Sequence, residues 1–323
     1  MPTGRKRKKR GSQTDRKSNV PENAWSLLVF TLLSQISVGA FCVAEILNFS
    51  HSQEFGKKGL HFFRLYSRLF VLASAVLAGI SAIFHLHKWV NAYHAFNNFR
   101  TSWVSKEMVF FLLFMFCVAL LASMSWQKID RKHIQQVFVM AGLLCGIALV
   151  YSMAKIYMLP TVPTWDAWTT PGLFSTAVLI LGSLAVACMC QALLGSTKSS
   201  FLTEKIRDRW SRKTLPALVK VVMFFLVIGI LISGFFAYRL MTVDAAGSGA
   251  SMMGPGKQIL LFFRIFFFIL GWIFLVFYLK KLRIEEDIQG KFRGLLYSAF
   301  IFLAFAEISG RYLFYVSFFR TGL

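Results

Sequence analysis

Residues 85–107 read HLHKWVNAYHAFNNFRTSWVSKE, and this stretch joins two strongly apolar segments of the protein. His85 directly follows one apolar run, and Glu107 stands near the start of the next. Asn98, Arg100 and Trp103 lie between them. An apolar run of about 20 residues is long enough to cross ~30 Å of hydrocarbon as a helix. The stretch therefore predicts a connection at a membrane surface, with a group able to exchange a proton at each end.

The rest of the sequence repeats this pattern of apolar segments and short polar connections. Of its 323 residues, 56% are hydrophobic and only 15% are charged, which leaves too little polar surface for a protein of this size in water. The net charge of +22 lies in the connections and the N-terminal segment. That placement is typical of a membrane protein facing anionic lipid and does not indicate nucleic-acid binding. We expect the surrounding lipid to be a partner of the protein.

Eight segments are long and apolar enough to span a bilayer, and each must satisfy its own backbone hydrogen bonds as a helix. The sequence therefore predicts an all-α, polytopic membrane protein with eight transmembrane helices. Residues 1–23 are polar and basic and are predicted to be a disordered tail without a cleavable export signal. Residues 24–323 form the membrane domain. The expected spans are 24–47, 66–86, 106–126, 136–158, 172–195, 216–239, 258–280 and 295–318.

Eight spans place both termini on one side of the membrane, here called side A. The side-B connections hold 16 lysines and arginines, whereas the side-A connections and the C-terminus hold four. The positive-inside rule therefore predicts that side B is cytoplasmic and that both termini lie outside a bacterial inner membrane. The basic N-terminal tail conflicts with this orientation, because its eight lysines and arginines would lie outside. The opposite orientation thus stays open.

Ionisable groups inside the expected spans gather toward side A. Charged side chains in hydrocarbon usually pair with one another or line a functional cavity. Glu45, by contrast, lies near side B and is interpreted as an ordinary interfacial residue. The side-A groups come from five different spans: His85, Glu107, Lys155, Arg264, Glu307 and Arg311.

The connection 159–171 adds aromatic residues and prolines at the same surface. It contains three prolines, which favour a stiff and non-helical lid, and no lysine or arginine. Trp165 and Trp168 can stack on a flat ring or anchor at the lipid headgroups. We interpret this end as a polar-lined cavity for an amphiphile with a redox-active head and a lipid tail.

Structural explanations compete with this interpretation. Glu107 can be a first-turn acid that the helix dipole favours, and His85 can be an interfacial histidine without chemistry. Glu307 and Arg311 are four residues apart and can form a structural ion pair, which Arg264 or Lys155 would extend. The five cysteines lie in apolar segments without metal-binding spacing and are interpreted as packing residues.

Three stretches resemble the membrane anchor subunit of bacterial dimethyl sulfoxide reductase, the DmsC family. The first is His85-Leu86 with Asn98-x-Arg100-Thr-Ser-Trp-x-Ser-x-Glu107, the second is Thr161-Val-Pro-Thr-Trp165, and the third is Glu307-x-x-Gly310-Arg311-x-x-Phe314-Tyr315. They occur in order within an eight-span pattern, and the resemblance covers nearly all of residues 24–320. The sequence departs from the family pattern after His85, where His87-Lys88-Trp89 replaces the usual Gly and nearby Pro. It also departs from the family pattern at Asn91, where an arginine is common, and in having a basic N-terminal tail.

The resemblance implies a subunit that oxidises menaquinol and has no complete activity alone. Its implied partners are a four-cluster iron–sulfur subunit and a molybdopterin catalytic subunit. The family's quinol-site histidine and glutamate fall on His85 and Glu107. We expect these two residues to accept the quinol protons and to release them on side A, while the electrons pass to the iron–sulfur partner. The remaining expected quinol-binding residues are Asn98, Arg100, Trp103, Trp165, Glu307 and Arg311.

Two other classes of protein remain as alternatives. A cytochrome b-type anchor needs facing histidine pairs inside the spans, whereas all six histidines lie in connections or at span ends. A secondary transporter predicts broken helices and an internal repeat, and the sequence shows neither. We therefore expect no haem, iron–sulfur cluster or metal on this protein. The terminal electron acceptor, the quinone type, the docking side of the iron–sulfur subunit and the role of the tail stay open.

Overall fold

A computed structural model describes residues 24–50, 57–85, 98–195, 208–243, 252–284 and 292–319. The predicted tail 1–23 and residues 86–97 of the opening connection lie outside these residues. All regular elements in the described part are helices, which confirms the all-α prediction. They are α1 (Ala24–Ser50), α2 (Lys57–His85), α4 (Trp103–Trp126), α5 (Lys132–Tyr157), α6 (Thr169–Leu194), the π-helical turn η3 (Trp210–Thr214), α8 (Leu215–Thr242), α9 (Pro255–Ile284) and α10 (Arg293–Val316).

Eight of the described helices are long and apolar enough to cross a membrane, as the sequence predicted. The largest difference lies at α2, which begins at Lys57 and not near residue 66. Its first two turns carry Lys57, Lys58, His61 and Arg64, so the helix extends beyond the apolar span into a polar region. A hydropathy window detects only the apolar part of such a helix.

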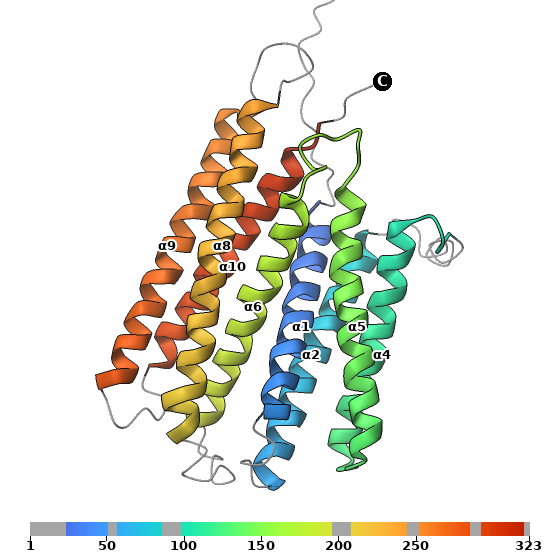
Figure 1. Cartoon of the computed structure of the whole chain (residues 1–323), viewed down its shortest axis with the longest axis vertical. Coiled ribbons are helices and arrows are strands. Elements are labelled where there is room, and N and C mark those ends of the chain that lie inside the picture. Colours follow the sequence, from blue (N-terminus) through green and yellow to red (C-terminus); the bar gives the residue numbers. More distant parts are fainter. Residues whose placement is uncertain are drawn as a thin grey trace, which may run out of the picture.

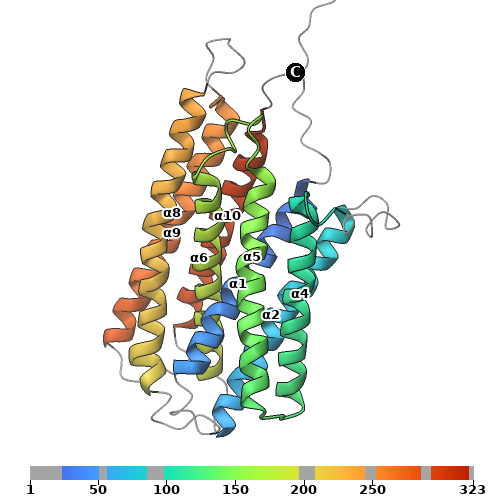
Figure 2. The ribbon, with the colours of Figure 1, turned by 45° about the vertical axis from the view of Figure 1, so that its right-hand side comes forward.

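The helices form two groups of four, which lie beside each other in Figures 1 and 2. In the first group, α1, α2, α4 and α5 form a ring in which each helix packs on the next and α5 returns to α1. In the second group, α6, α8, α9 and α10 form a ring in the same order. The arrangement of helices thus repeats, although the sequence shows no repeat.

The two groups meet mainly where α1 packs against α6. A methyl group on Gly39 would collide with the backbone of α6 at Val178, and one on Gly182 would collide with the backbone of α1 at Gly39. The two glycines therefore permit backbone contact at the crossing, as small residues do between membrane helices. These two helices are also the most buried spans, with 67% of the α1 window and 72% of the α6 window inside the protein. The other helices surround them.

Candidate functional site at the side-A end

The ends of the 85–107 connection lie on neighbouring helices. His85 is the last residue of α2, and Glu107 lies in the second turn of α4, which packs against α2. Ser102 caps α4, because its side chain accepts a hydrogen bond from the Ser105 backbone N–H at 3.4 Å. Glu107 is 8% exposed, so its carboxyl group lies inside the first helix group. The side chain of His85 lies outside the described residues, and its contact with Glu107 stays a prediction.

The residues expected to orient these two groups lie closer to the surface. Asn98 and Arg100 are exposed in the turn before α4. Trp103 is half-buried at the start of α4, where its ring contacts Tyr151 edge-on and lies 4.0 Å from the Lys106 ammonium. These contacts fix Trp103 at the first turn of α4. The predicted contacts of all three side chains with quinol remain untested.

The connection between α5 and α6 is anchored to the end of α10. Trp165 donates a hydrogen bond from its indole nitrogen to the Phe314 carbonyl oxygen at 2.8 Å, and its ring stacks on the Phe314 ring. Thr164 donates to the Ser317 carbonyl oxygen at 3.0 Å. Trp165 is only 9% exposed. Trp165 therefore holds the connection in place, whereas Trp168 is exposed and contacts Phe235 edge-on.

The two buried charged residues of α10, Glu307 and Arg311, interact with different helices and not with each other. Arg264 of α9 donates from Nη2 to Glu307 Oε2 at 3.5 Å. Arg311 donates from Nη2 to Gln35 Oε1 of α1 at 3.0 Å, and its guanidinium lies 3.7 Å from the centre of the Phe174 ring. The described part of the structure thus holds no ion pair between Glu307 and Arg311, although their spacing favours one. Instead, Arg311 joins the second helix group to the first.

Two tyrosines connect the first group to α10 at the same end. Tyr157, the last residue of α5, donates from its hydroxyl group to the Tyr315 hydroxyl oxygen at 3.3 Å. The Tyr315 hydroxyl oxygen lies 3.5 Å from Thr31 Oγ1 of α1. We call Tyr157, Tyr315, Thr31, Gln35 and Arg311 the side-A network.

The side-A network does not include every residue that the sequence placed there. Lys155 is partly buried and lies over the Tyr151 ring, with 5.7 Å between the ammonium and the ring centre. This contact is with Tyr151 and not with Glu307 or Arg311, whose expected ion pair Lys155 was to extend. Gln35, Tyr157 and Tyr315 were missed by sequence reasoning because they are not charged. The sequence does contain a signal for them, because their amide and hydroxyl groups are polar side chains within long apolar runs.

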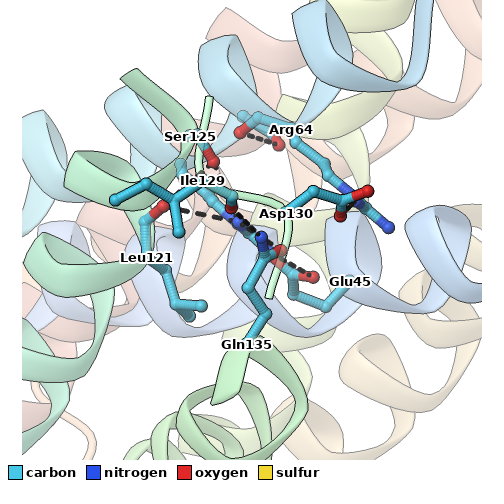
Figure 3. Close-up of polar contacts among 9 residues, drawn as sticks. Glu45, Arg64, Leu121, Ser125, Ile129, Asp130 and Gln135 are labelled. Atoms are coloured by element: carbon cyan, nitrogen blue, oxygen red, sulfur yellow. Dashed lines mark hydrogen bonds and ion pairs between the residues drawn. The ribbon is translucent and has the colours of Figure 1, made fainter. Parts of the chain in front are cut away.

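A second buried polar cluster lies at the opposite end, within the first helix group (Figure 3). Arg68 of α2 binds both carboxylate oxygens of Glu45, with nitrogen–oxygen distances of 2.8 and 3.2 Å. It also donates to Ser125 Oγ at 2.9 Å and to Gln135 Oε1 at 3.3 Å. The interpretation of Glu45 as an interfacial residue was wrong: its exposed fraction is 7%. Arg68 ties α1, α2, α4 and α5 together near side B.

Similarity to known proteins gives the family. A family model described as "DMSO reductase anchor subunit (DmsC)" matches residues 19–316. The protein belongs to the DmsC family. It is 26% identical over 296 residues to the C subunit of an anaerobic dimethyl sulfoxide reductase from Haemophilus influenzae, a match over 90% of this protein and 92% of that one. It is 27% identical over 176 residues to the YnfH subunit of an anaerobic dimethyl sulfoxide reductase from Escherichia coli, a match over 52% of this protein and 58% of that one.

Membership of the DmsC family makes this a multi-pass membrane protein of the anchor-subunit type. The family match covers both helix groups, including the whole side-A network. Among the described residues, no three histidine, cysteine, aspartate or glutamate side chains come together in a group that could hold a metal ion. The polar side chains described at the side-A end carry carboxyl, hydroxyl, amide, guanidinium and ammonium groups.

Proposed function

We propose that this DmsC-family protein binds menaquinol at its side-A end and oxidises it for a reductase complex. The observation that carries the proposal is the position of Glu107. It is a buried carboxyl group in the second turn of α4, next to the helix that ends at His85. Buried ionisable groups in membrane helices usually mark a pathway or a binding site.

The chemistry of quinol oxidation fits the groups at this end. A quinol releases two protons and two electrons, so its site needs two proton acceptors and a route for electrons. His85 would accept or relay one proton, because imidazole exchanges protons near neutral pH. Glu107 would take the other. Asn98 and Arg100 would orient these groups from the turn before α4, and Trp103 would border the ring.

The other predicted site residues, Trp165, Arg311 and Glu307, would act without lying next to His85 and Glu107. Trp165 would position the α5–α6 connection over the site through its hydrogen bond to Phe314. Arg311 would place a positive charge near the network from the second helix group, and Glu307 would balance the charge of Arg264. In this arrangement, the quinol protons leave at side A.

The electrons would pass to an iron–sulfur subunit and then to a molybdopterin catalytic subunit. Both relatives are named as chains of an anaerobic dimethyl sulfoxide reductase, which supports partners of this kind. The protein itself would lie in a bacterial inner membrane with both termini outside, as the loop charges predict. The terminal acceptor would be set by the catalytic partner.

The test is quinol oxidation in membranes that contain the assembled complex. Glu107→Gln keeps the size of the side chain but removes the base, and His85→Ala removes the imidazole. Because a positioned acid or base typically contributes a factor of 10² or more, we expect each variant to lower the quinol-analogue oxidation rate by about 10²-fold. Turnover driven by reduced viologen, which delivers electrons directly to the partner subunits, should stay unchanged.

Asp166→Asn is the matched control, because Asp166 is an exposed acid in the α5–α6 connection at the same end. Its quinol oxidation rate should equal that of the wild type. Wild-type quinol oxidation in both the Glu107→Gln and His85→Ala complexes would contradict the proposed function.

A further inference from the structure

Two lysines and two aromatic rings form a continuous series across α4 and α5 at the side-A end. The Lys106 ammonium lies 4.0 Å from the centre of the Trp103 ring, in the first turn of α4. The Trp103 and Tyr151 ring centres are 5.7 Å apart, and the Lys155 ammonium lies 5.7 Å from the centre of the Tyr151 ring. The series therefore joins the start of α4 to the end of α5, two helices that lie side by side in Figures 1 and 2.

Neither ammonium group of this series is neutralised within the described part of the protein. Lys106 and Lys155 contact the faces of aromatic rings, and no carboxylate among the described residues forms an ion pair with either of them. Each ammonium group carries three N–H donors, and a ring face leaves donors unused. Both lysines are only partly buried. The series thus presents two positive charges that are available to an anion from outside.

The two lysines lie at the depth of the lipid headgroups. α4 has 24 residues and α5 has 26, whereas about 20 residues cross the hydrocarbon of a bilayer. Lys106 is in the first turn of α4 and Lys155 is in the last turn of α5, so their ammonium groups extend to the polar region on side A. The side-A connections hold few other cations, so this pair is not part of a general basic surface.

An exposed apolar stripe of α5 continues from Tyr151 into the membrane. Its residues follow one another at intervals of three and four, which places them on one face of the helix, and their exposed fractions lie between 51% and 66%. At 1.5 Å per residue the stripe is about 21 Å long. Lys155 extends it by one turn toward side A. The stripe consists of Val137, Met140, Leu144, Ile147 and Tyr151.

We propose that Lys106 and Lys155 bind the phosphate of an anionic phospholipid on side A, with one acyl chain along the α5 stripe. Trp103 and Tyr151 would border the headgroup between the two ammonium groups. The observations that favour a lipid are the two unpaired charges at headgroup depth and their continuity with the apolar stripe. A small anion in water needs no such stripe, and a neutral quinol needs no pair of lysines. This inference goes beyond the proposed function and does not depend on it.

The test measures lipid binding to the purified full-length protein in detergent by native mass spectrometry. The probes are phosphatidylglycerol, which is anionic, and phosphatidylcholine, which is zwitterionic. We expect the wild type to bind phosphatidylglycerol about tenfold more tightly than phosphatidylcholine. Lys106→Gln and Lys155→Gln should each weaken phosphatidylglycerol binding about fivefold, and the double variant should weaken it about 30-fold. Lys106→Arg/Lys155→Arg keeps both charges and should bind as the wild type does.

Lys257→Gln is the matched control. Lys257 lies at the same end in the second helix group, but its ammonium group already donates to the Met252 carbonyl oxygen at 2.9 Å. This variant should bind phosphatidylglycerol as the wild type does, and an equal loss there would show that net charge alone governs binding and would reject the site.

Two results would overturn the lipid site: equal wild-type affinity for both lipids, or undiminished phosphatidylglycerol binding in Lys106→Gln/Lys155→Gln. If the double variant does not fold, the two single variants decide by the same criterion. Displacement of the bound lipid by inorganic phosphate would also contradict the proposal, because the acyl chain would then contribute nothing. Lipid binding is measured without quinol, so failure of the proposed function in the Glu107→Gln and His85→Ala complexes would leave this result unaffected.

Discussion

Two buried arginine–glutamate pairs lie in different helix groups and toward opposite ends of the protein, and they are bonded differently. Arg68 binds both oxygens of Glu45 and also donates to side chains of α4 and α5. Arg264 makes one 3.5 Å contact with Glu307, and Arg264 Nε and Glu307 Oε1 have no hydrogen-bond partner among the described residues. The same two residue types thus form a fully bonded pair near side B and a loosely bonded pair near side A.

We interpret the difference between the two pairs as a difference of role: the Arg68–Glu45 pair holds helices together, whereas the Arg264–Glu307 pair lies at the proposed functional end. Breaking a fully hydrogen-bonded pair leaves a buried charge without compensation, so such a pair holds its helices in place. A buried pair with unused donors and acceptors stabilises the fold less, because each unsatisfied buried group costs free energy. The loosely bonded pair joins α9 to α10 one turn before Arg311, which belongs to the side-A network. The unused hydrogen-bonding capacity therefore lies toward side A, where we propose that the quinol protons leave.

The largest expected effect comes from applying one substitution to both pairs. Arg68→Met leaves Glu45 buried and unpaired among four helices, and we expect a loss of about 3–5 kcal/mol in the free energy of unfolding. Arg264→Met removes one 3.5 Å contact and leaves Glu307 buried, and because the native pair is only loosely bonded we expect a smaller loss of about 1–3 kcal/mol. Thermal denaturation of the detergent-solubilised complex measures both. Equal losses in the two variants would remove the distinction between the pairs.

The double variant Glu45→Met/Arg68→Met sharpens the same comparison. Replacing a whole buried ion pair by apolar side chains is often neutral. We therefore expect the double variant to recover most of the stability that Arg68→Met loses, and quinol oxidation at side A to stay within about twofold of wild type. A double variant as unstable as Arg68→Met would show that Arg68 acts through Ser125 and Gln135 more than through Glu45.

A smaller effect is expected at Gly310, which makes room for the loosely bonded pair. A methyl group at this position would collide with the guanidinium of Arg264. Gly310→Ala should therefore push Arg264 away from Glu307 and destabilise the protein by about 1–3 kcal/mol, as overpacking does. Gly294→Ala is the control, because nothing lies within 4 Å of a methyl group there. Equal melting temperatures for the two variants would contradict the placement of Arg264.

The smallest effect is expected at Trp165, which fastens the α5–α6 connection to α10. Trp165→Phe keeps an aromatic ring against Phe314 but loses the indole hydrogen bond to its carbonyl oxygen. We expect a loss of about 1 kcal/mol in stability, the usual net value of one hydrogen bond. Quinol oxidation should fall less than in Glu107→Gln, because Trp165 holds the connection and its ring is covered by protein. An equal fall in activity would instead indicate direct contact with the quinol ring.

The sequence predicted the helices better than it predicted their polar contacts. The eight spans follow from local hydropathy, which needs no knowledge of neighbouring helices. Glu107 is buried near the start of α4, while its role in a site stays a prediction. The partner of Glu307 could not be predicted, because the i, i+4 spacing to Arg311 is visible in the sequence whereas the approach of α9 is not.

Two further differences have the same physical origin. Glu45 is five residues from the end of α1, so the sequence alone suggests an interfacial position. Only the packing of α2, α4 and α5 around it makes Glu45 and Arg68 a buried pair. Trp165 stands among prolines and was expected in a lid over the site, but the end of α10 covers its ring. In both cases, contacts between residues far apart in the sequence determine which side chain is buried.

The most direct test of the central claim locates the bound quinone itself. A menaquinone analogue with a photoreactive azide would be irradiated in membranes that contain the assembled complex, and the labelled peptides would be identified by mass spectrometry. We predict labelling within residues 98–107 at the side-A end, which excess quinol prevents and Glu107→Gln reduces. Labelling that excess quinol prevents only around Glu45 and Arg68, near side B, would contradict the account.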